Sequence, residues 1–242
     1  MDNYKKLAAD ASAGKKKFAV LLDPDKCPQN FLTEVIKLSI KSDVDYFFIG
    51  GSLLMNDNQC KVIRLIKENS TIPVLLFPGN NLQLNNQADG ILLLSLISGR
   101  NPDMLIGRHV ISAPFLKASA LEIISTGYML IDSGSMTTVM YMSNTTPIPS
   151  DKSEIAVCTA LAGEMLGMKL IYMDAGSGSK NPVPVAMIRA VKEAVKIPLI
   201  VGGGIVSAEL AKQAITAGAD VVVVGNAIER NPGLIPEIAA MR

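Results

Sequence analysis

Residues 198–227 read PLIVGGGIVSAELAKQAITAGADVVVVGNA, and their hydrophobic pattern indicates the fold class. Two short apolar runs, 198–201 and 220–224, flank a segment with helical periodicity, 208–218. Continuous rather than alternating hydrophobicity is typical of strands covered on both faces, as in parallel sheets. Gly218 stands where a helix C-cap is expected. The stretch therefore predicts a strand, a helix and a second, parallel strand, with a glycine-rich loop after each strand.

Apolar runs of the same kind recur along the 242 residues. They lie at 17–22, 44–49, 73–77, 90–94, 128–131 and 169–173, in addition to the two runs quoted above. Further helical patterns lie between strands at 31–42, 60–69 and 186–195. Eight strands alternating with helices predict an α/β fold, a (β/α)8 TIM barrel formed as a single domain over residues 1–242.

One unit departs from this plan. Residues 78–89, PGNNLQLNNQAD, follow the third strand and are too short and too rich in Asn for a crossover helix. We expect a loop in place of this helix. Such a gap in the outer ring would open a groove along the barrel wall.

The composition narrows the class of protein. A net charge of +1, spread along the chain, leaves no electrostatic footprint for nucleic acid. Three cysteines at wide spacing form no metal motif and are typical of a reducing compartment. The sequence has neither a secretory signal nor an apolar run long enough to span a bilayer. We therefore expect a cytoplasmic protein with no nucleic-acid partner and no transmembrane segment.

The glycine-rich ends of the last two strands predict a phosphate site. In barrels of this kind, function lies at the carboxyl ends of the strands, and phosphate commonly binds the loops after strands seven and eight. Glycine is needed because a Cβ would block the approach of backbone N–H groups to the anion. An alternative is that these glycines only form tight turns. The expected phosphate contacts are Gly203, Gly204, Gly225 and Asn226.

Acidic residues also stand at strand ends. Asp23, after the first strand, is a candidate ligand for Mg²⁺, which favours one or two carboxylates and completes its shell with water and substrate phosphate. Ser52, after the second strand, is a second oxygen donor within reach. Asp25 is expected to cap the following turn or helix. Lys26 has two alternative roles, either binding a diphosphate or lying on the surface.

Asp174 is the candidate catalytic group. It follows the sixth strand in YMDAGSGS, beside the predicted phosphate loops, where a carboxylate can accept a proton from a bound hydroxyl. Ser177 and Gly178 can contact a small polar ligand, and Tyr172 lies on the same strand face as Asp174. The only histidine, His109, lies in a helical pattern, which favours a packed or surface residue over a catalyst.

Several long motifs together resemble those of the geranylgeranylglyceryl phosphate synthase family, which also includes the heptaprenylglyceryl phosphate synthases. The resemblance covers essentially the whole chain. The motifs are LLDPDK (21–26), FFIGGSL (47–53), ADGILLLSLISGRNPDMLIGRHV (88–110), YMSNTTPIPSDK (141–152), YMDAGSGS (172–179), VGGGI (201–205) and VVGNAIE (223–229).

The resemblance implies a prenyltransferase on a modified (β/α)8 barrel with one helix replaced by a loop. It implies that the C3 hydroxyl of sn-glycerol 1-phosphate is joined to an allylic prenyl diphosphate, with geranylgeranyl diphosphate as the preferred donor. The implied reaction requires Mg²⁺, releases diphosphate and belongs to ether phospholipid biosynthesis. A homo-oligomer, dimer or hexamer, is implied as well, and peripheral membrane contact is left open.

By motif, Asp23 and Ser52 match the metal ligands of the family, and Asp174 matches its base. The phosphate loops of the family match Gly203, Gly204, Gly225 and Asn226. The glycerol phosphate segment falls on Tyr172, Met173, Asp174, Ala175, Gly176, Ser177 and Gly178.

The chain departs from many relatives at three positions: Asp174 stands for Glu, Leu21 for a Lys found in some members, and Met104 for Tyr. The Asp174 side chain is one methylene shorter than the Glu of these relatives. The prenyl tail needs an apolar trough, although residues at helical spacing often belong to the core. The candidates are Met104, Leu105, Ile111, Phe115, Tyr141 and Met142.

Two rival functions stay open at this point. The first is a phospho-sugar isomerase of the histidine-biosynthesis barrel type, which would use Asp23 and Asp132 as an acid/base pair across the barrel mouth. The second is a catalytically silent barrel that binds a phosphorylated metabolite.

Overall fold

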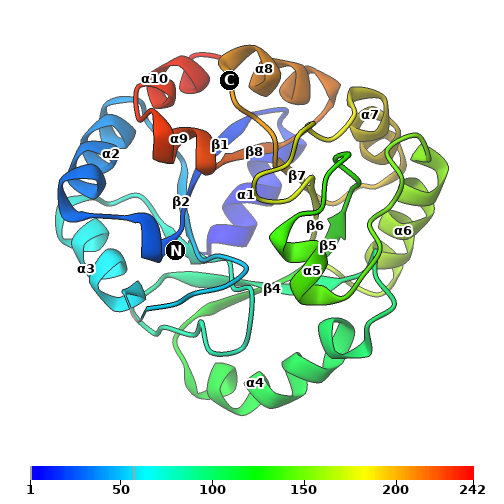
Figure 1. Cartoon of the computed structure of the whole chain (residues 1–242), viewed down its shortest axis with the longest axis horizontal. Helices are drawn as coiled ribbons and strands as arrows, with labels where there is room; N and C mark the ends of the chain where they lie inside the picture. The colour runs from blue at the N-terminus through cyan, green and yellow to red at the C-terminus, as the bar shows by residue number, and fades with distance from the viewer. Residues whose placement is uncertain (1, 57) are drawn as a thin grey trace.

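The computed structural model describes residues 2–56 and 58–242. Its eight parallel strands form a closed barrel in chain order, β1 to β8, which confirms the predicted TIM barrel (Figure 1). The strands are β1 (Lys17–Leu22), β2 (Tyr46–Ile49), β3 (Val74–Leu76), β4 (Gly90–Leu96), β5 (Glu122–Leu130), β6 (Leu170–Asp174), β7 (Leu199–Gly202) and β8 (Val221–Val224).

A ring of helices surrounds the strands (Figure 1). The α-helices are α1 (Asn3–Ser12), α2 (Gln29–Lys41), α3 (Gln59–Asn69), α4 (Arg108–Ala118), α5 (Thr138–Ser143), α6 (Ser153–Met165), α7 (Val185–Ala194), α8 (Ala208–Ala217), α9 (Asn226–Arg230) and α10 (Leu234–Ala239). A 3₁₀ turn, η1 (Pro24–Lys26), follows β1, and a π-helical turn, η2 (Asp103–Gly107), leads into α4.

The predicted gap in the ring is confirmed. Residues 77–89, all of them described, connect β3 to β4 without a helix. Only loops lie between α3 and α4 on this side of the barrel (Figure 1).

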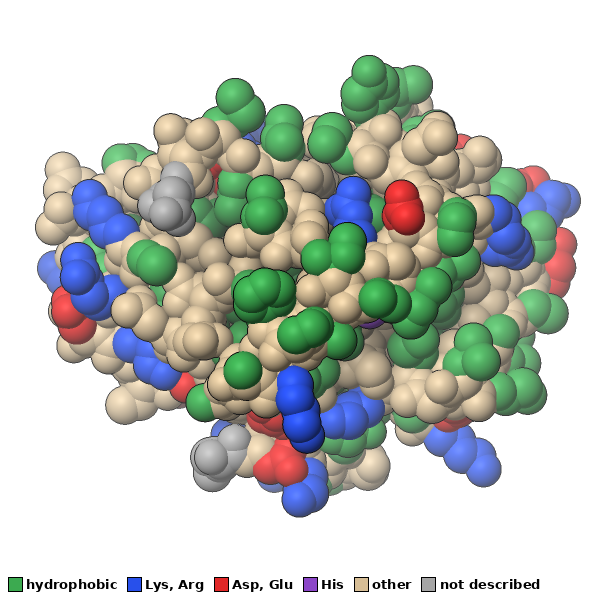
Figure 2. Space-filling view, turned by 90° about the horizontal axis from the view of Figure 1, so that it is seen from below, with side chains coloured by type: hydrophobic (Ala, Val, Ile, Leu, Met, Phe, Trp, Pro, Cys, Tyr) green, Lys and Arg blue, Asp and Glu red, His purple; other side chains and the backbone are tan. Residues whose placement is uncertain are grey.

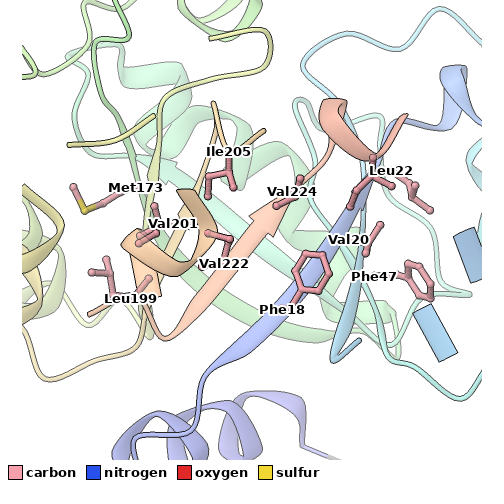
Figure 3. Packing of buried hydrophobic residues seen from close by; sticks show 14 of the residues in the cluster. Phe18, Val20, Leu22, Phe47, Met173, Leu199, Val201, Ile205, Val222 and Val224 are labelled. Carbon is pink, nitrogen blue, oxygen red and sulfur yellow. The ribbon is translucent and has the colours of Figure 1, made fainter. Parts of the chain in front are cut away.

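The core has two layers because successive side chains of each strand point to opposite faces. One layer fills the barrel, with Phe48, Tyr128 and Tyr172 among its large members. The other lies between the strands and the helices and includes Phe18, Met173 and Val222 (Figure 3).

Helix α1 packs against the amino-terminal end of the barrel. Leu7 belongs to the apolar cluster inside the barrel, and the Glu122 carboxylate accepts hydrogen bonds from the N–H groups of Asn3 (2.7 Å) and Tyr4 (2.8 Å) at the start of the helix. The carboxyl ends of the strands form the opposite end of the barrel. No helix in the described ranges is long and apolar enough to cross a membrane.

Candidate active site

A polar pocket of about 340 Å³ opens at the carboxyl ends of the strands. The loops after β1, β2, β6, β7 and β8 line it, as expected for this fold. Most of the residues predicted from the sequence meet here. They are Asp23, Ser52, Tyr172, Asp174, Gly176, Ser177, Gly178, Gly203, Gly204, Gly225 and Asn226.

The loops of this pocket are packed too closely for side chains at two of the predicted glycines. Gly203 and Gly204 have φ angles of +80° and +70°, in the left-handed region. A Cβ on Gly203 would lie 2.4 Å from Asp174 Oδ1, and one on Gly204 would lie 2.7 Å from the Pro182 nitrogen. The glycines are therefore needed for close packing of the loops after β6 and β7.

Replacing Gly203 by Ala is expected to lower the melting temperature by several degrees and to weaken phosphate binding, because the new Cβ displaces Asp174. Gly14→Ala is the matched control, since Gly14 also has a positive φ (+73°), has no atom within 4 Å of the new Cβ and does not line the pocket. Both variants are compared by thermal unfolding and by calorimetric titration with inorganic phosphate. Equal losses in the two would rule out a specific effect on Asp174.

The loops after β6 and β8 are joined by side chains. The Asn226 amide nitrogen donates to Ser177 Oγ at 3.0 Å, and α9 begins at Asn226. These residues bring exposed polar groups to the rim of the pocket beside Gly178 and Gly225. The rim can thus offer both backbone and side-chain donors to an anion.

Asp174 lies on the floor of the pocket, and its side chain is held from two sides. The residue is 8% exposed. The Tyr128 hydroxyl donates to Oδ2 at 2.7 Å, and the Gly176 N–H donates to Oδ1 at 2.7 Å. Burial raises the pKa of Asp174 above its ordinary value, and the two hydrogen bonds act in the opposite direction. A buried, oriented carboxylate with a raised pKa has the properties of a general base.

Tyr128 was not identified from the sequence. Burial first, and then the charge of Asp174, holds the pKa of Tyr128 well above its ordinary value, so the hydroxyl is a permanent donor. Its ring lies 5.6 Å from that of Tyr172 and 6.1 Å from that of Phe77, centre to centre. An aromatic residue in a strand is typical of core, and Tyr128 gave no signal of a polar role for that reason.

A charged cluster stands at the opposite wall. Lys26 Nζ lies 3.0 Å from Asp23 Oδ2 and 3.5 Å from Glu229 Oε2, and all three residues line the pocket. Burial alone would lower the pKa of Lys26, but the two carboxylates raise it. Burial raises the pKa of Glu229. Lys26 therefore belongs to the site, and Glu229, three residues after Asn226 on one turn of helix, is a further site residue that this spacing could have revealed.

The donor set around Asp23 suits Mg²⁺ better than a metal held in an all-protein cage. Asp23, Glu229 and Ser52 supply two carboxylates and a hydroxyl to the same pocket. No group of three His, Cys, Asp or Glu able to hold a metal ion occurs in residues 2–56 and 58–242. Mg²⁺ fits few protein ligands, because it keeps water and takes substrate phosphate oxygens.

Three of the predictions need correction. The side chain of Met173 lies in the outer core because it alternates with Tyr172 and Asp174 along β6 (Figure 3). Ala175, directly after the strand, belongs to the same apolar cluster. They do not line the polar pocket. Asp25 does not cap α2: its carboxylate accepts hydrogen bonds from the N–H groups of Met55 and Asn56, and so holds the loop after β2.

An apolar groove of about 350 Å³ joins the polar pocket. It lies between the helix-free segment 77–84 and the η2–α4 unit, where the missing helix leaves the barrel wall open. Figure 2 shows apolar side chains gathered on this side of the molecule. The two cavities share five lining residues: Gly51, Ser52, Phe77, Tyr128 and Val139.

The predicted apolar trough is only partly confirmed. Met104 and Met142 line the groove. Leu105, Ile111, Phe115 and Tyr141 do not, and the last three are more than half exposed. The wall instead includes His109, whose Nε2 donates to the Leu94 carbonyl at 2.8 Å, so the histidine ties α4 to β4.

A polar pocket joined to an apolar groove at the carboxyl end of a (β/α)8 barrel is typical of an enzyme site for ligands with both a polar and a hydrocarbon part. Residues 12–241 match the model of the PcrB family, and the chain belongs to this family. It is an enzyme of the geranylgeranylglyceryl phosphate synthase type, a prenyltransferase.

Similar proteins agree on this assignment. A geranylgeranylglyceryl phosphate synthase of Spirosoma linguale is 56% identical over 95% of this chain and 92% of its own length. The one of Pyrococcus horikoshii is 40% identical over 91% and 86%. The crystal structure of the Thermoplasma acidophilum (S)-3-O-geranylgeranylglyceryl phosphate synthase, in complex with substrate sn-glycerol-1-phosphate, superposes with a TM-score of 0.93 at 31% identity and covers 100% of this chain and 98% of that one.

Proposed function

We propose that the enzyme transfers a prenyl group from its diphosphate to the C3 hydroxyl of sn-glycerol 1-phosphate, with geranylgeranyl as the preferred prenyl group. The observation that carries the proposal is the junction of the polar pocket with the apolar groove at five shared residues. A prenyl diphosphate has the same division, with an anionic head and a hydrocarbon tail. The junction is where the reacting carbon of the donor and the hydroxyl of the acceptor would meet.

The acceptor is assigned to the polar pocket. Its phosphate would bind the loops at Gly203, Gly204, Gly225 and Asn226, which line this pocket. The relative from Thermoplasma acidophilum, solved with sn-glycerol-1-phosphate, supports this choice of acceptor.

The donor is assigned to the groove, with its diphosphate beside Asp23 and Ser52. Lys26 would supply a positive charge to the diphosphate from its place between Asp23 and Glu229. Mg²⁺, held through Asp23 and Ser52, would supply charge neutralisation of the leaving group when bound.

The chemistry follows from these positions. The allylic C–O bond to the diphosphate breaks, and the oxygen of the C3 hydroxyl forms the new ether bond to that carbon. The proton of the C3 hydroxyl passes to the Asp174 carboxylate, which Tyr128 and Gly176 hold in place. The diphosphate leaves with the electrons of the broken bond, so charge and atoms balance.

The rival functions lose their structural support. Asp132 does not line either cavity, and its carboxylate instead accepts the Gly134 N–H at 3.0 Å. The isomerase alternative needs Asp132 opposite Asp23 in one pocket. A silent binding barrel does not account for Asp174, since buried carboxylates with a raised pKa in a pocket are typical of catalytic sites. The homo-oligomer and the cytoplasmic location stay predictions.

The test is an incubation of the enzyme with sn-glycerol 1-phosphate and radiolabelled geranylgeranyl diphosphate, with Mg²⁺ or with EDTA. We expect an organic-extractable phospho-ether that forms with Mg²⁺ only, and much less product from sn-glycerol 3-phosphate. Donors with shorter and longer tails then define the tail preference. Absence of product with every donor would contradict the proposal.

Tyr128→Phe tests the role of the hydroxyl. Removing a hydrogen bond that lowers the pKa of Asp174 moves the acid limb of the kcat–pH profile to higher pH, because the ionised carboxylate is the active form. We expect kcat at neutral pH to fall about tenfold, as for loss of one hydrogen bond to a charged group. An acid limb at its wild-type position would contradict this role for Tyr128.

A further inference from the structure

The segment that replaces the missing helix contains a buried amide with an unusual set of partners. Gln83 is 2% exposed, although it lies in a loop. Its Nε2 donates to the Gly51 carbonyl at 2.8 Å. Its Oε1 accepts hydrogen bonds from the N–H groups of Gly79 (3.2 Å) and Gly51 (3.4 Å). One side chain therefore joins the loop after β2 to the loop after β3.

These two loops leave no room for side chains of their own at this contact. A Cβ on Gly79 would lie 2.3 Å from the Gly51 oxygen, and one on Gly50 would lie 1.9 Å from the Phe77 oxygen. The Gly50 N–H donates to the Leu22 carbonyl at 3.1 Å, whereas the N–H and carbonyl of Gly51 bond the Gln83 side chain. Without the Gln83 amide, three backbone groups of the half-buried residues Gly51 and Gly79 would lose this partner.

The clamped backbone lies at the junction of the two cavities. Gly51 and Ser52 line both cavities, and Gly79 lines the groove. A Cβ on Gly51 would lie 3.3 Å from Asp23 Cγ, so the Gly51 backbone is also packed against the Asp23 side chain. A shift of Gly51 would move Ser52 and loosen the contact with Asp23.

We propose that Gln83 is a positioning residue for the prenyl diphosphate, acting through Gly51 and Ser52. The inference rests on the proposed function, because it assigns the diphosphate to this junction. Gln83 touches neither cavity itself and is not a catalytic residue. The acceptor phosphate is assigned to the loops after β6, β7 and β8 at the far side of the polar pocket, and the Gln83 side chain makes its hydrogen bonds to Gly51 and Gly79 instead. Its loss should weaken the donor site and spare the acceptor site.

Asn85 provides a matched control in the same segment. It is 8% exposed, and its Nδ2 donates to Cys60 Sγ at 2.9 Å, while its Oδ1 accepts the Gln87 N–H at 2.9 Å. These bonds tie the segment to α3, away from both cavities. Asn85→Leu removes a buried amide from the loop without touching Gly51.

The experiment compares Gln83→Met, Gln83→Glu and Asn85→Leu with the wild type. Gln83→Met keeps the length of the side chain and removes all three hydrogen bonds. Gln83→Glu keeps the oxygen that accepts from Gly51 and Gly79, replaces the donor to the Gly51 carbonyl, and adds an acidic group. For each variant we would measure KM for geranylgeranyl diphosphate, KM for sn-glycerol 1-phosphate, kcat and the melting temperature. Calorimetric titration with inorganic diphosphate and Mg²⁺ reports the donor site without turnover.

We expect Gln83→Met to raise KM for the donor about tenfold or more and to weaken diphosphate binding similarly, with KM for the acceptor changed less than about twofold. Gln83→Glu should show the same selectivity, so the test survives if the Met variant fails to fold. Asn85→Leu should lower the melting temperature and leave both KM values near wild type.

Equal changes in the two KM values, or the same donor defect in Asn85→Leu, would overturn the inference and leave Gln83 a purely structural residue. Wild-type enzyme that makes no phospho-ether would refute the proposed function instead, so the two failures are distinguishable.

Discussion

We expect Asp174→Asn to lower kcat by about 10² to 10⁴-fold, which is the range for loss of a general base. The amide keeps the size of the carboxylate and can still accept the Gly176 N–H, so the phosphate loops stay in place. It cannot take the proton of the attacking hydroxyl at neutral pH. The affinity for sn-glycerol 1-phosphate, measured by calorimetry, should stay within a few-fold of wild type.

The same variant is also expected to change the pH dependence of the free energy of unfolding in a known direction. Because the folded-state pKa of Asp174 is raised, the native state binds the proton more tightly than the unfolded state. The stability contribution of Asp174 is therefore highest at low pH and is lost as the pH rises through the folded pKa. The neutral amide avoids this loss, so Asp174→Asn should melt at the wild-type temperature or above it at pH 7. Full activity in this variant would remove Asp174 from the mechanism.

Asp23→Asn is expected to lower kcat/KM for the prenyl diphosphate on the order of 10² to 10³-fold, since charge stabilisation by a bound metal contributes several kcal/mol to the transition state. The Mg²⁺ concentration for half-maximal activity should rise, because a neutral amide is a weaker ligand than a carboxylate. The variant also loses the ion pair with Lys26. Steady-state rates measured over a range of Mg²⁺ concentrations give both kcat/KM and the Mg²⁺ concentration for half-maximal activity.

Asp132→Asn is the matched control for this variant. It makes the same chemical change at another strand end, but Asp132 lines neither cavity. We expect near wild-type kinetics and an unchanged Mg²⁺ response. A loss in Asp132→Asn as large as that in Asp23→Asn would contradict the assignment of the site and revive the isomerase pairing.

Much of the fold could be predicted because each strand of a parallel barrel is covered on both faces, and so reads as a continuous apolar run. The boundaries were less accurate: the run at 128–131 is only the end of β5, which begins at Glu122. Residues before Tyr128, such as Ser125 and Thr126, interrupt the apolar pattern in this strand. The loop after β3 was predictable because its twelve or so residues, rich in Asn, are too few for a crossover helix.

The pocket could be predicted wherever glycine or acid follows a strand, as at Asp23, Asp174, Gly203 and Gly225. The period-two rule, applied strictly, would also have excluded Met173, because its neighbours Tyr172 and Asp174 face inward. Sequence patterns failed at groups whose role depends on contacts distant in the chain. Tyr128 reaches Asp174 across 46 positions of sequence.

The apolar groove was harder to predict for a local reason. The π-helical turn Asp103–Gly107 precedes α4, and Pro114 lies inside that helix. A π turn adds residues per turn and shifts the faces of the helix that follows. Ile111 and Phe115, two of the trough candidates on this helix, are both exposed.

In the proposed reaction the C3 hydroxyl of sn-glycerol 1-phosphate attacks the prenyl carbon while diphosphate departs. Mass spectrometry of the products formed from acceptor labelled with ¹⁸O at the C3 hydroxyl distinguishes which bond breaks. We expect the label to be retained in the ether oxygen and the released diphosphate to be unlabelled. Label in the diphosphate, or an ether without ¹⁸O, would show that a different bond breaks and would refute this reaction.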